Sequence, residues 1–171
     1  MSENTAKMNI DRFEEEEDTQ KGKFLTFRLG NEDYAIEIRY VTEIIGIQRI
    51  TDVPDMPDYV RGVINLRGTV VPVMDVRSRF RLPPRAYDDR TCIVVVNMND
   101  TAVGLLVDKV NEVSDIPDAQ IEPPPPTQGE SARCIQGLGK MGEEVKIILD
   151  VDRLLFPEER AGLGESEGQA A

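Results

Sequence analysis

The chain has 171 residues and a formal net charge of −12, from 20 Lys and Arg, 32 Asp and Glu, and no His. This acidic balance argues against nucleic acid and against an anionic membrane surface as partners, because both call for basic groups on the protein. A sequence without His excludes a His-based catalytic triad and a His metal site. No stretch is apolar over a length that would cross a bilayer, so we expect no direct membrane insertion. The length allows one domain or two small fused units.

The two cysteines and the N-terminus indicate the compartment. Cys92 and Cys134 lack the spacing of metal or redox motifs, and each stands beside an apolar run. We therefore expect both to be buried free thiols in a reducing compartment. The N-terminus lacks the apolar region of a signal peptide, which favours a cytoplasmic protein. No constellation of catalytic residues is recognisable, so we expect no enzyme activity and no cofactor.

The two ends of the chain differ in composition from the part between them. Residues 1–22 are polar and include the acidic run Glu14–Asp18, and residues 157–171 are also mostly polar. Like charges repel one another and bury no apolar surface, so we expect both ends to be disordered. One ordered domain is then expected from residue 23 to residue 156.

Alternating apolar residues predict two strands at the start of this domain. Apolar and polar residues alternate in 23–30 and again in 34–38, on either side of a turn. The period then lengthens, which predicts a helical turn whose single face carries Ile38, Val41, Ile44 and Ile45 and which ends at Gly46. Residues 47–60 contain two prolines and are expected to be extended and rich in turns.

Residues 61–80 predict a β-hairpin followed by one helical turn. Two apolar arms flank Arg67-Gly68, and glycine permits the positive φ that a tight turn requires. Asp75 stands where an N-cap is needed, with a carboxylate that can accept free backbone N–H groups. Val76 and Phe80 are four residues apart, so both are expected to face the core.

The second half of the domain predicts more strands of the same kind. Residues 91–98 form a nearly continuous apolar run, expected to be a strand covered on both faces, and residues 102–107 return beside it. Residues 115–126 contain four successive prolines and are expected to be a stiff connector. Residues 134–149 predict another hairpin, after which Asp150 caps a last helical turn.

An internal repeat relates the two halves. Residues 24–44 match 93–113 in their apolar positions without a gap, and residues 62–76 match 137–151. Two matches in the same order predict two similar units. Because each unit has four or five short strands rich in β-branched residues, we expect each to form a small closed barrel.

The two copies differ in their charged residues. Arg61 and Arg67 of the first copy have uncharged counterparts in the second, whereas Glu43 keeps an acidic one, Glu112. This exchange predicts an ion pair between Glu43 and Arg67. If the pair is partly buried, removing one partner leaves a buried charge unpaired; if it is exposed, the pair adds little to stability. The alternative is that Arg67 is only a solvated turn residue.

Four segments carry a resemblance to a known family. The stretches DYAIEIRYVTEIIG, PDYVRGVINLRGTVVPVMDVRSRF and VGLLVDKVNEV, with the GLG of QGLGKMGEEVKIILDVDRLLF, resemble the bacterial chemotaxis coupling family CheW. The match runs from Lys23 to Phe156. It implies a mainly β fold of two five-stranded SH3-like barrels packed side by side, roughly 23–80 and 91–156, with short helical turns and with exchange of strands allowed.

The resemblance also implies partners and site residues. A non-enzymatic adaptor of this family joins the histidine kinase CheA, through its regulatory domain, to the cytoplasmic tips of methyl-accepting chemotaxis receptors. Such an adaptor is recruited to receptor arrays at the inner face of the membrane, and we expect it to be monomeric alone. The positions that match the family's coupling residues are Val41, Glu43, Gly62, Arg67 and Val110.

Ile44 joins these positions because, like Val41 and Val110, it stands near the end of one of the matching helical turns. Apolar residues left over at the junction of the barrels could there receive an amphipathic helix. For Val41, Ile44 and Val110, plain core packing remains the alternative. Two other functions also remain open. One is the CheW-like regulatory domain of a kinase or of a CheV-type adaptor, and the other is a small-barrel ligand-binding module.

Overall fold

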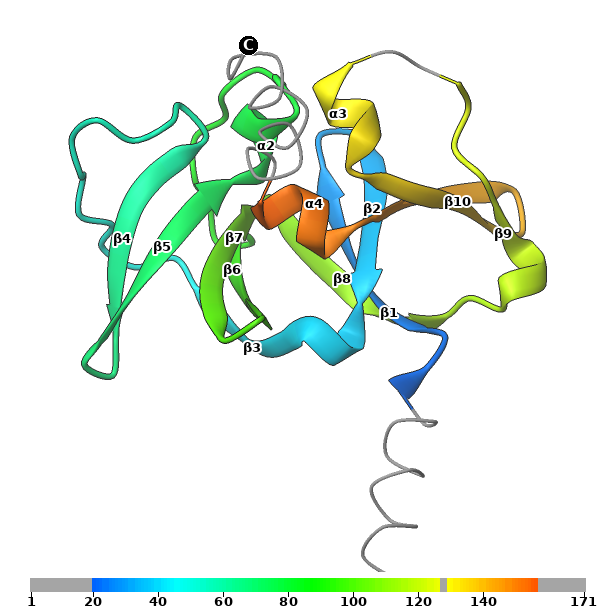
Figure 1. The fold of residues 1–171 in the computed structure, drawn as a ribbon, viewed down its shortest axis with the longest axis horizontal. Helices are drawn as coiled ribbons and strands as arrows, with labels where there is room; N and C mark the ends of the chain where they lie inside the picture. Colours follow the sequence, from blue (N-terminus) through cyan, green and yellow to red (C-terminus); the bar gives the residue numbers. More distant parts are fainter. Residues whose placement is uncertain (1–19, 127–128, 157–171) are drawn as a thin grey trace, which may run out of the picture.

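The computed structural model describes residues 20–126 and 129–156, which form two β-sheets with a few short helices (Figure 1). The first sheet has six strands in the order β8-β1-β2-β11-β10-β9. Their bounds are β1 Lys23–Leu29, β2 Glu32–Glu37, β8 Lys109–Asp115, β9 Ile121–Glu122, β10 Ile135–Met141 and β11 Glu144–Leu149. The second sheet has five strands in the order β3-β6-β7-β5-β4. These are β3 Val41–Gly46, β4 Val60–Leu66, β5 Thr69–Asp75, β6 Cys92–Met98 and β7 Thr101–Val107.

The helices are single turns at the ends of strands. They are the 3-10 turns η1 Ile38–Tyr40 and η2 Asp118–Gln120, and the α-helical turns α2 Val76–Arg79, α3 Glu130–Arg133 and α4 Val151–Leu155. The prediction of a mainly β, SH3-like fold with short helical turns is therefore confirmed. Full barrel closure is not seen, because no strand ladder in the described part joins the outer strands of either sheet. The short strand β9 also adds a sixth member to one sheet.

The two sheets have the same topology, and each combines strands from both repeats. When the second repeat is placed on the first, β8-β1-β2-β11-β10 corresponds strand by strand to β3-β6-β7-β5-β4. Among these five equivalent strands, each sheet therefore takes two from one repeat and three from the other, and β9 is an extra strand from the second repeat. The limits 23–80 and 91–156 describe the repeats in the sequence, whereas the sheets exchange strands between them. The chain passes from sheet to sheet at two equivalent places, between β2 and β3 and between β7 and β8.

The core has a central cluster between the sheets and one smaller cluster inside each sheet. Strand β6 shows why its sequence is continuously apolar. Val94 and Val96 pack in the central cluster, while Ile93 and Val95 point the other way into the cluster of the five-stranded sheet. Because successive side chains of a strand alternate between faces, a strand covered on both sides must be apolar throughout. The expectation for residues 91–98 is confirmed.

Both hairpins and both capped turns agree with their predictions. Strands β4 and β5 meet at Arg67 and Gly68, whose φ angles are +52° and +87°, as in the mirror-image turns that suit twisted hairpins. The Asp75 carboxylate accepts N–H bonds from Arg77 at 3.0 Å and Ser78 at 3.4 Å. Asp150 caps α4 in the same way, with the Arg153 N–H at 3.2 Å.

The helical turn predicted over residues 38–46 is wrong beyond Tyr40. Residues 41–46 form the edge strand β3, and the matching residues of the second repeat form β8. Val41 pairs with Val96 and Ile44 with Val94, and a bulge lies between Val41 and Glu43. The bulge shifts the apolar alternation, so that a strand acquires a spacing close to that of a helix. Four of the six residues in β3 are β-branched, which favours the strand.

Two further expectations have different outcomes. Cys134 is buried, but Cys92 is only half-buried, so the prediction of a buried thiol is wrong for Cys92. The expected disorder of 1–22 and 157–171 concerns residues that, apart from 20–22, lie outside the described part of the chain.

Candidate protein-interaction site

The predicted pair of Glu43 and Arg67 is present. Arg67 Nη2 lies 2.5 Å from Glu43 Oε1, and Nη1 donates to Oε2 at 3.1 Å. Glu43 lies on β3 and Arg67 in the turn between β4 and β5. Since β3 and β4 are the two outer strands of the five-stranded sheet, this bidentate contact joins the opposite edges of the sheet at one end. No backbone ladder among the described residues joins these edges. The fork geometry of a guanidinium on a carboxylate makes the contact directional.

The pair is exposed, which decides between the two energetic alternatives. The Arg67 side chain is 72% exposed and that of Glu43 is 28% exposed. The hydrogen bond from Arg67 lowers the pKa of the Glu43 carboxyl, and the same bond raises the pKa of Arg67. Because water screens exposed charges, we expect the pair to add little to folding stability. Its carboxylate and guanidinium are instead oriented at a surface that another molecule can reach.

A shallow pocket lies beside this pair. Its volume is about 410 Å³, and the residues that line it are Thr42, Glu43, Leu66, Arg67, Thr69, Val71, Val95 and Ala102. The pocket thus combines a polar rim with an apolar floor from β5 and β6. Such a combination suits a protein surface that docks at the end of the sheet.

Gly62 has an architectural part in the same sheet. Its φ is +148°, and a Cβ built there would lie 2.1 Å from the Thr51 carbonyl oxygen. The close approach comes from a bulge between Val60 and Gly62 and from the paired backbone of Thr51 and Val63. A side chain at this position would push residue 51 away from β4, so Gly62 shapes the strand and does not line the pocket beside Glu43.

The three apolar candidates lie on the edge strands β3 and β8. Val41 and Val110 are half-buried and pack against the central cluster, one from each sheet. Ile44 is 44% exposed, so the core alternative is wrong for this residue. Its repeat counterpart Val113 is 52% exposed on β8. The structure therefore brings Glu43 and Arg67 together, and it places Val41 and Val110 at the rim of the junction between the sheets.

Sequence reasoning singled out Arg61 as a charged residue that the second repeat lacks, but it missed the surface around this residue. Arg61 Nε donates to the Tyr87 hydroxyl at 3.0 Å and lies 3.8 Å from Asp75 Oδ2. A pocket of about 390 Å³ is lined here by Ile47, Gln48, Ile50, Asp52, Arg61 and Tyr87. The uncharged counterpart of Arg61 in the second repeat was the available signal. The mixed apolar and polar lining was not readable, because residues 47–60 and 81–90 follow no strand or helix period.

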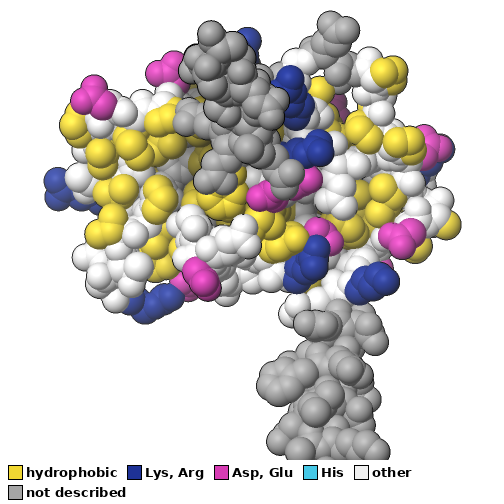
Figure 2. Space-filling model, viewed as in Figure 1, with side chains coloured by type: hydrophobic (Ala, Val, Ile, Leu, Met, Phe, Trp, Pro, Cys, Tyr) yellow, Lys and Arg dark blue, Asp and Glu magenta, His cyan; other side chains and the backbone are white. Residues whose placement is uncertain are grey.

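The surface is mixed in character. Figure 2 shows hydrophobic side chains in patches over this face of the molecule, with separate acidic and basic side chains between them. Within residues 20–126 and 129–156, no group of three or more His, Cys, Asp or Glu could hold a metal ion. None of the helices in that described part could cross a membrane. The fold and the site together define a class of protein, a small SH3-like β protein with two like sheets, in which an ion pair and apolar side chains are exposed at the end and edges of the sheets.

Comparisons with known proteins identify the family. A model described as the CheW-like domain matches residues 23–158. The chemotaxis protein CheW of Klebsiella aerogenes is 40% identical over 140 residues, which cover 81% of this chain and 84% of the relative. The Bacillus subtilis protein of the same name is 34% identical over 137 residues, with 80% and 88% covered. The chain belongs to the CheW-like family.

A solved structure supports the same assignment. The crystal structure of the scaffolding protein CheW from Thermoanaerobacter tengcongensis matches with a TM-score of 0.74 at 33% identity, covering 79% of this chain and 92% of that one. The resemblance stated from the sequence is confirmed, and with it the class of a non-enzymatic chemotaxis scaffold.

Proposed function

We propose that this chain couples methyl-accepting chemotaxis receptors to the histidine kinase CheA by binding both at receptor arrays on the inner face of the membrane. The observation that supports this best is the exposed Glu43–Arg67 pair, which occupies two of the positions at which the family resemblance implies coupling. Arg67 is largely exposed and Glu43 is half-buried beside it, and an ion pair open to water in this way adds little to folding stability.

The two partners would bind at two separate surfaces. We assign the kinase's regulatory domain to the end of the five-stranded sheet, where Glu43 and Arg67 border a shallow pocket. We assign the receptor to the junction of the sheets, where Val41 and Val110 lie at the rim and Ile44 is exposed. An amphipathic receptor helix could bury its apolar face against these aliphatic side chains. Gly62 would act indirectly, by keeping β4 in shape.

The test measures binding of a receptor-tip fragment and of the kinase's regulatory domain separately. We expect Arg67→Ala and Glu43→Ala each to weaken binding of the kinase domain, and the double variant to lose less than the sum, because the pair acts as a unit. Ile44→Asp should weaken the receptor fragment selectively. Additive effects of the two alanine variants would contradict the pairing.

The second repeat offers a matched control. Lys140 on β10 and Glu122 on β9 form an exposed ion pair in the six-stranded sheet, with side chains 56% and 55% exposed. Lys140→Ala removes an exposed cation of the same kind at a place that the proposal does not use. We expect unchanged binding of both partners, and unchanged melting temperatures for every variant of an exposed residue. Equal loss from Lys140→Ala and Arg67→Ala would refute the assignment of the surface.

A further inference from the structure

The two passages of the chain between the sheets are equivalent in the repeat but differ in chemistry. The first is the turn Ile38–Tyr40, where Arg39 is exposed, contacts Glu37 at 3.4 Å and lies over the Tyr40 ring. The second is the single residue Asp108, between the end of β7 and the start of β8. The repeat aligns Arg39 with Asp108. Asp108 is 9% exposed, so one passage is solvated and the other carries a buried carboxylate.

The Asp108 carboxylate is bonded to both sheets at once. Its Oδ2 accepts the Gly30 N–H at 2.8 Å, from the turn between β1 and β2 of the six-stranded sheet. The same oxygen contacts Arg77 Nη1 at 2.5 Å, from α2 at the end of β5 in the five-stranded sheet. The Asp108 N–H also donates to the Arg28 carbonyl at 3.2 Å. A charge-assisted network with several donors on one oxygen holds its members in fixed relative positions.

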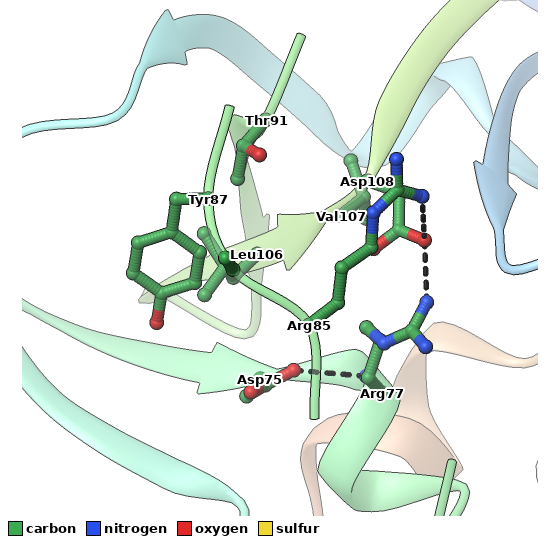
Figure 3. Close-up of a pocket in the computed structure, with 9 residues that line it drawn as sticks. Asp75, Arg77, Arg85, Tyr87, Thr91, Leu106, Val107 and Asp108 are labelled. Carbon is green, nitrogen blue, oxygen red and sulfur yellow. Dashed lines mark hydrogen bonds and ion pairs between the residues drawn. The ribbon is translucent and has the colours of Figure 1, made fainter. Parts of the chain in front are cut away.

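The network extends to the surface through a third donor. Arg85 Nη1 lies 3.3 Å from Asp108 Oδ2, and its side chain is 50% exposed. Arg85 also contacts Asp88, so the connector 81–90 is attached to the network. Figure 3 shows Arg77 and Arg85 converging on Asp108 from α2 and from this connector. Two further bonds hold Arg77 in place. Its backbone N–H donates to Asp75 Oδ1 at 3.0 Å, and its side-chain Nε donates to the Pro83 carbonyl oxygen at 3.0 Å.

Asp108 is close along the chain to a candidate receptor contact. Val107 before it is buried in the central cluster, and Val110 is two residues after it on β8, at the rim of that cluster. The rim has two sides, Val110 on β8 and Val41 on β3, which belong to different sheets. The position of one side relative to the other depends on how the sheets are joined. Of the two passages, only that at Asp108 is fixed by a buried ion pair among the described residues.

We propose that Asp108, Arg77 and Arg85 form an inter-sheet lock, and that Asp108 is a positioning residue that sets the separation of the β3 and β8 edges. The second half of this inference rests on the proposed function, because it assigns the receptor helix to the rim between those edges. The lock itself concerns only the geometry of the chain. Without these contacts, the distance between the β3 and β8 edges varies over a wider range. A smaller fraction of molecules then presents the separation that a receptor helix requires.

The experiment measures geometry and binding in the same variants. Asp108→Asn keeps the size of the side chain and removes its charge. Asp88→Asn is the control, because it removes the charge that pairs with Arg85 and keeps an oxygen that can accept the Arg90 and Thr91 N–H groups. Spin labels at Val70→Cys on β5 and Lys140→Cys on β10 report the distance between the sheets in a Cys92→Ser background, where buried Cys134 is unreactive. Hydrogen exchange of the Gly30 amide reports the bond to Asp108 directly.

The lock predicts a broader label-to-label distance distribution and faster Gly30 exchange for Asp108→Asn, with Asp88→Asn like the wild type. It also predicts about three- to tenfold weaker binding of the receptor-tip fragment, while binding of the kinase's regulatory domain stays within about twofold. A merely structural role would weaken both partners alike. If Asp108→Asn does not fold, Arg85→Met tests the same points. It removes the more exposed of the two arginines that contact Asp108, so we expect smaller changes in distance, exchange and binding in the same directions.

Three results would overturn the inference in different ways. Unchanged distances and unchanged Gly30 exchange in both variants would show that there is no lock. Altered distances with unchanged receptor binding would show that the lock does not position the rim. Equally weakened binding of the receptor fragment and of the kinase's regulatory domain would show that Asp108 has only a structural role. A wild-type chain that binds no receptor fragment at all would instead refute the proposed function and the positioning half, while the distance measurement would still decide on the lock.

Discussion

Replacing Lys146 by Met should destabilise the six-stranded sheet through the charge it leaves behind. Lys146 on β11 is 10% exposed, and its Nζ lies 2.6 Å from Asp33 Oδ2 on β2. The two residues are opposite each other in the parallel pairing of these strands, which joins the N-terminal and C-terminal parts of the sheet. Glu144 contacts the same ammonium at 3.0 Å but is 71% exposed. The variant therefore leaves the Asp33 carboxylate, whose side chain is only 12% exposed, without its main cation.

The magnitude follows from what remains around Asp33. Removing one partner of a fully buried ion pair costs about 3–5 kcal/mol. Asp33 keeps contacts to Arg28 Nε at 3.3 Å and to Asn111 Nδ2 at 3.2 Å, so we expect a smaller loss of about 2–3 kcal/mol. For a chain of this size that loss corresponds to a fall in melting temperature of roughly 5–10 °C.

The loss should also depend on pH. Burial alone would raise the pKa of the Asp33 carboxyl, but hydrogen bonds and charge from Lys146 and Arg28 hold it below its ordinary value. A carboxyl with a lowered pKa in the folded state stabilises the fold above its unfolded pKa, and this contribution disappears as the pH falls through the folded value. The difference between Lys146→Met and the wild type should therefore be largest near pH 7 and shrink below about pH 4.

Urea unfolding at pH 7 and at pH 3 measures these free energies. The exposed Lys140 on the neighbouring strand provides the control, since Lys140→Met should change stability by less than about 0.5 kcal/mol. Asp33→Asn combined with Lys146→Met removes both charges and should lose less than the sum of the single variants by about 1–3 kcal/mol. The reasoning fails if Lys146→Met behaves like Lys140→Met, or if its deficit does not shrink at low pH.

The remaining predictions concern backbone positions. Gly62→Ala should lose about 3 kcal/mol or more in a urea titration, because its Cβ would meet the Thr51 oxygen. Gly46→Ala, where a Cβ meets nothing within 4 Å, should stay within about 1 kcal/mol, and equal effects would contradict the close approach. Asp75→Ala should cost about 1–2 kcal/mol and more than Asp150→Ala, because Asp75 is 8% exposed and caps two N–H groups where Asp150 caps one. The reverse order in thermal melts would refute that ranking.

The hairpins, caps and strand periods could be predicted because their causes are local. Gly68 acts through its own positive φ angle, and Asp75 caps backbone N–H groups within three residues, so both roles are readable from sequence. The contact of Glu43 with Arg67 was predictable for another reason, namely that the repeat supplies an internal comparison in which one copy lacks the cation. The pairing of strands from different repeats was not readable, because either choice buries the same apolar pattern.

The wrong predictions arise where distant partners decide the structure. Strand β3 depends on pairing with β6, about fifty residues later in the chain, and its bulge produces a spacing that resembles a helix. The exposure of Ile44 follows from its place on an edge strand, which the sequence does not reveal. The network at Asp108 joins residues whose separation in sequence is 31 for Arg77 and 78 for Gly30, with no motif that links them.

The most direct test of the proposed coupling is the autophosphorylation rate of CheA in the presence of receptor-containing membranes, with and without this chain. The account predicts a rate in the three-component mixture well above that of any two components, and a clear reduction when Arg67→Ala replaces the wild type. Lys140→Ala should support the full rate. A kinase rate that does not change when the folded wild-type chain is added would contradict the central claim.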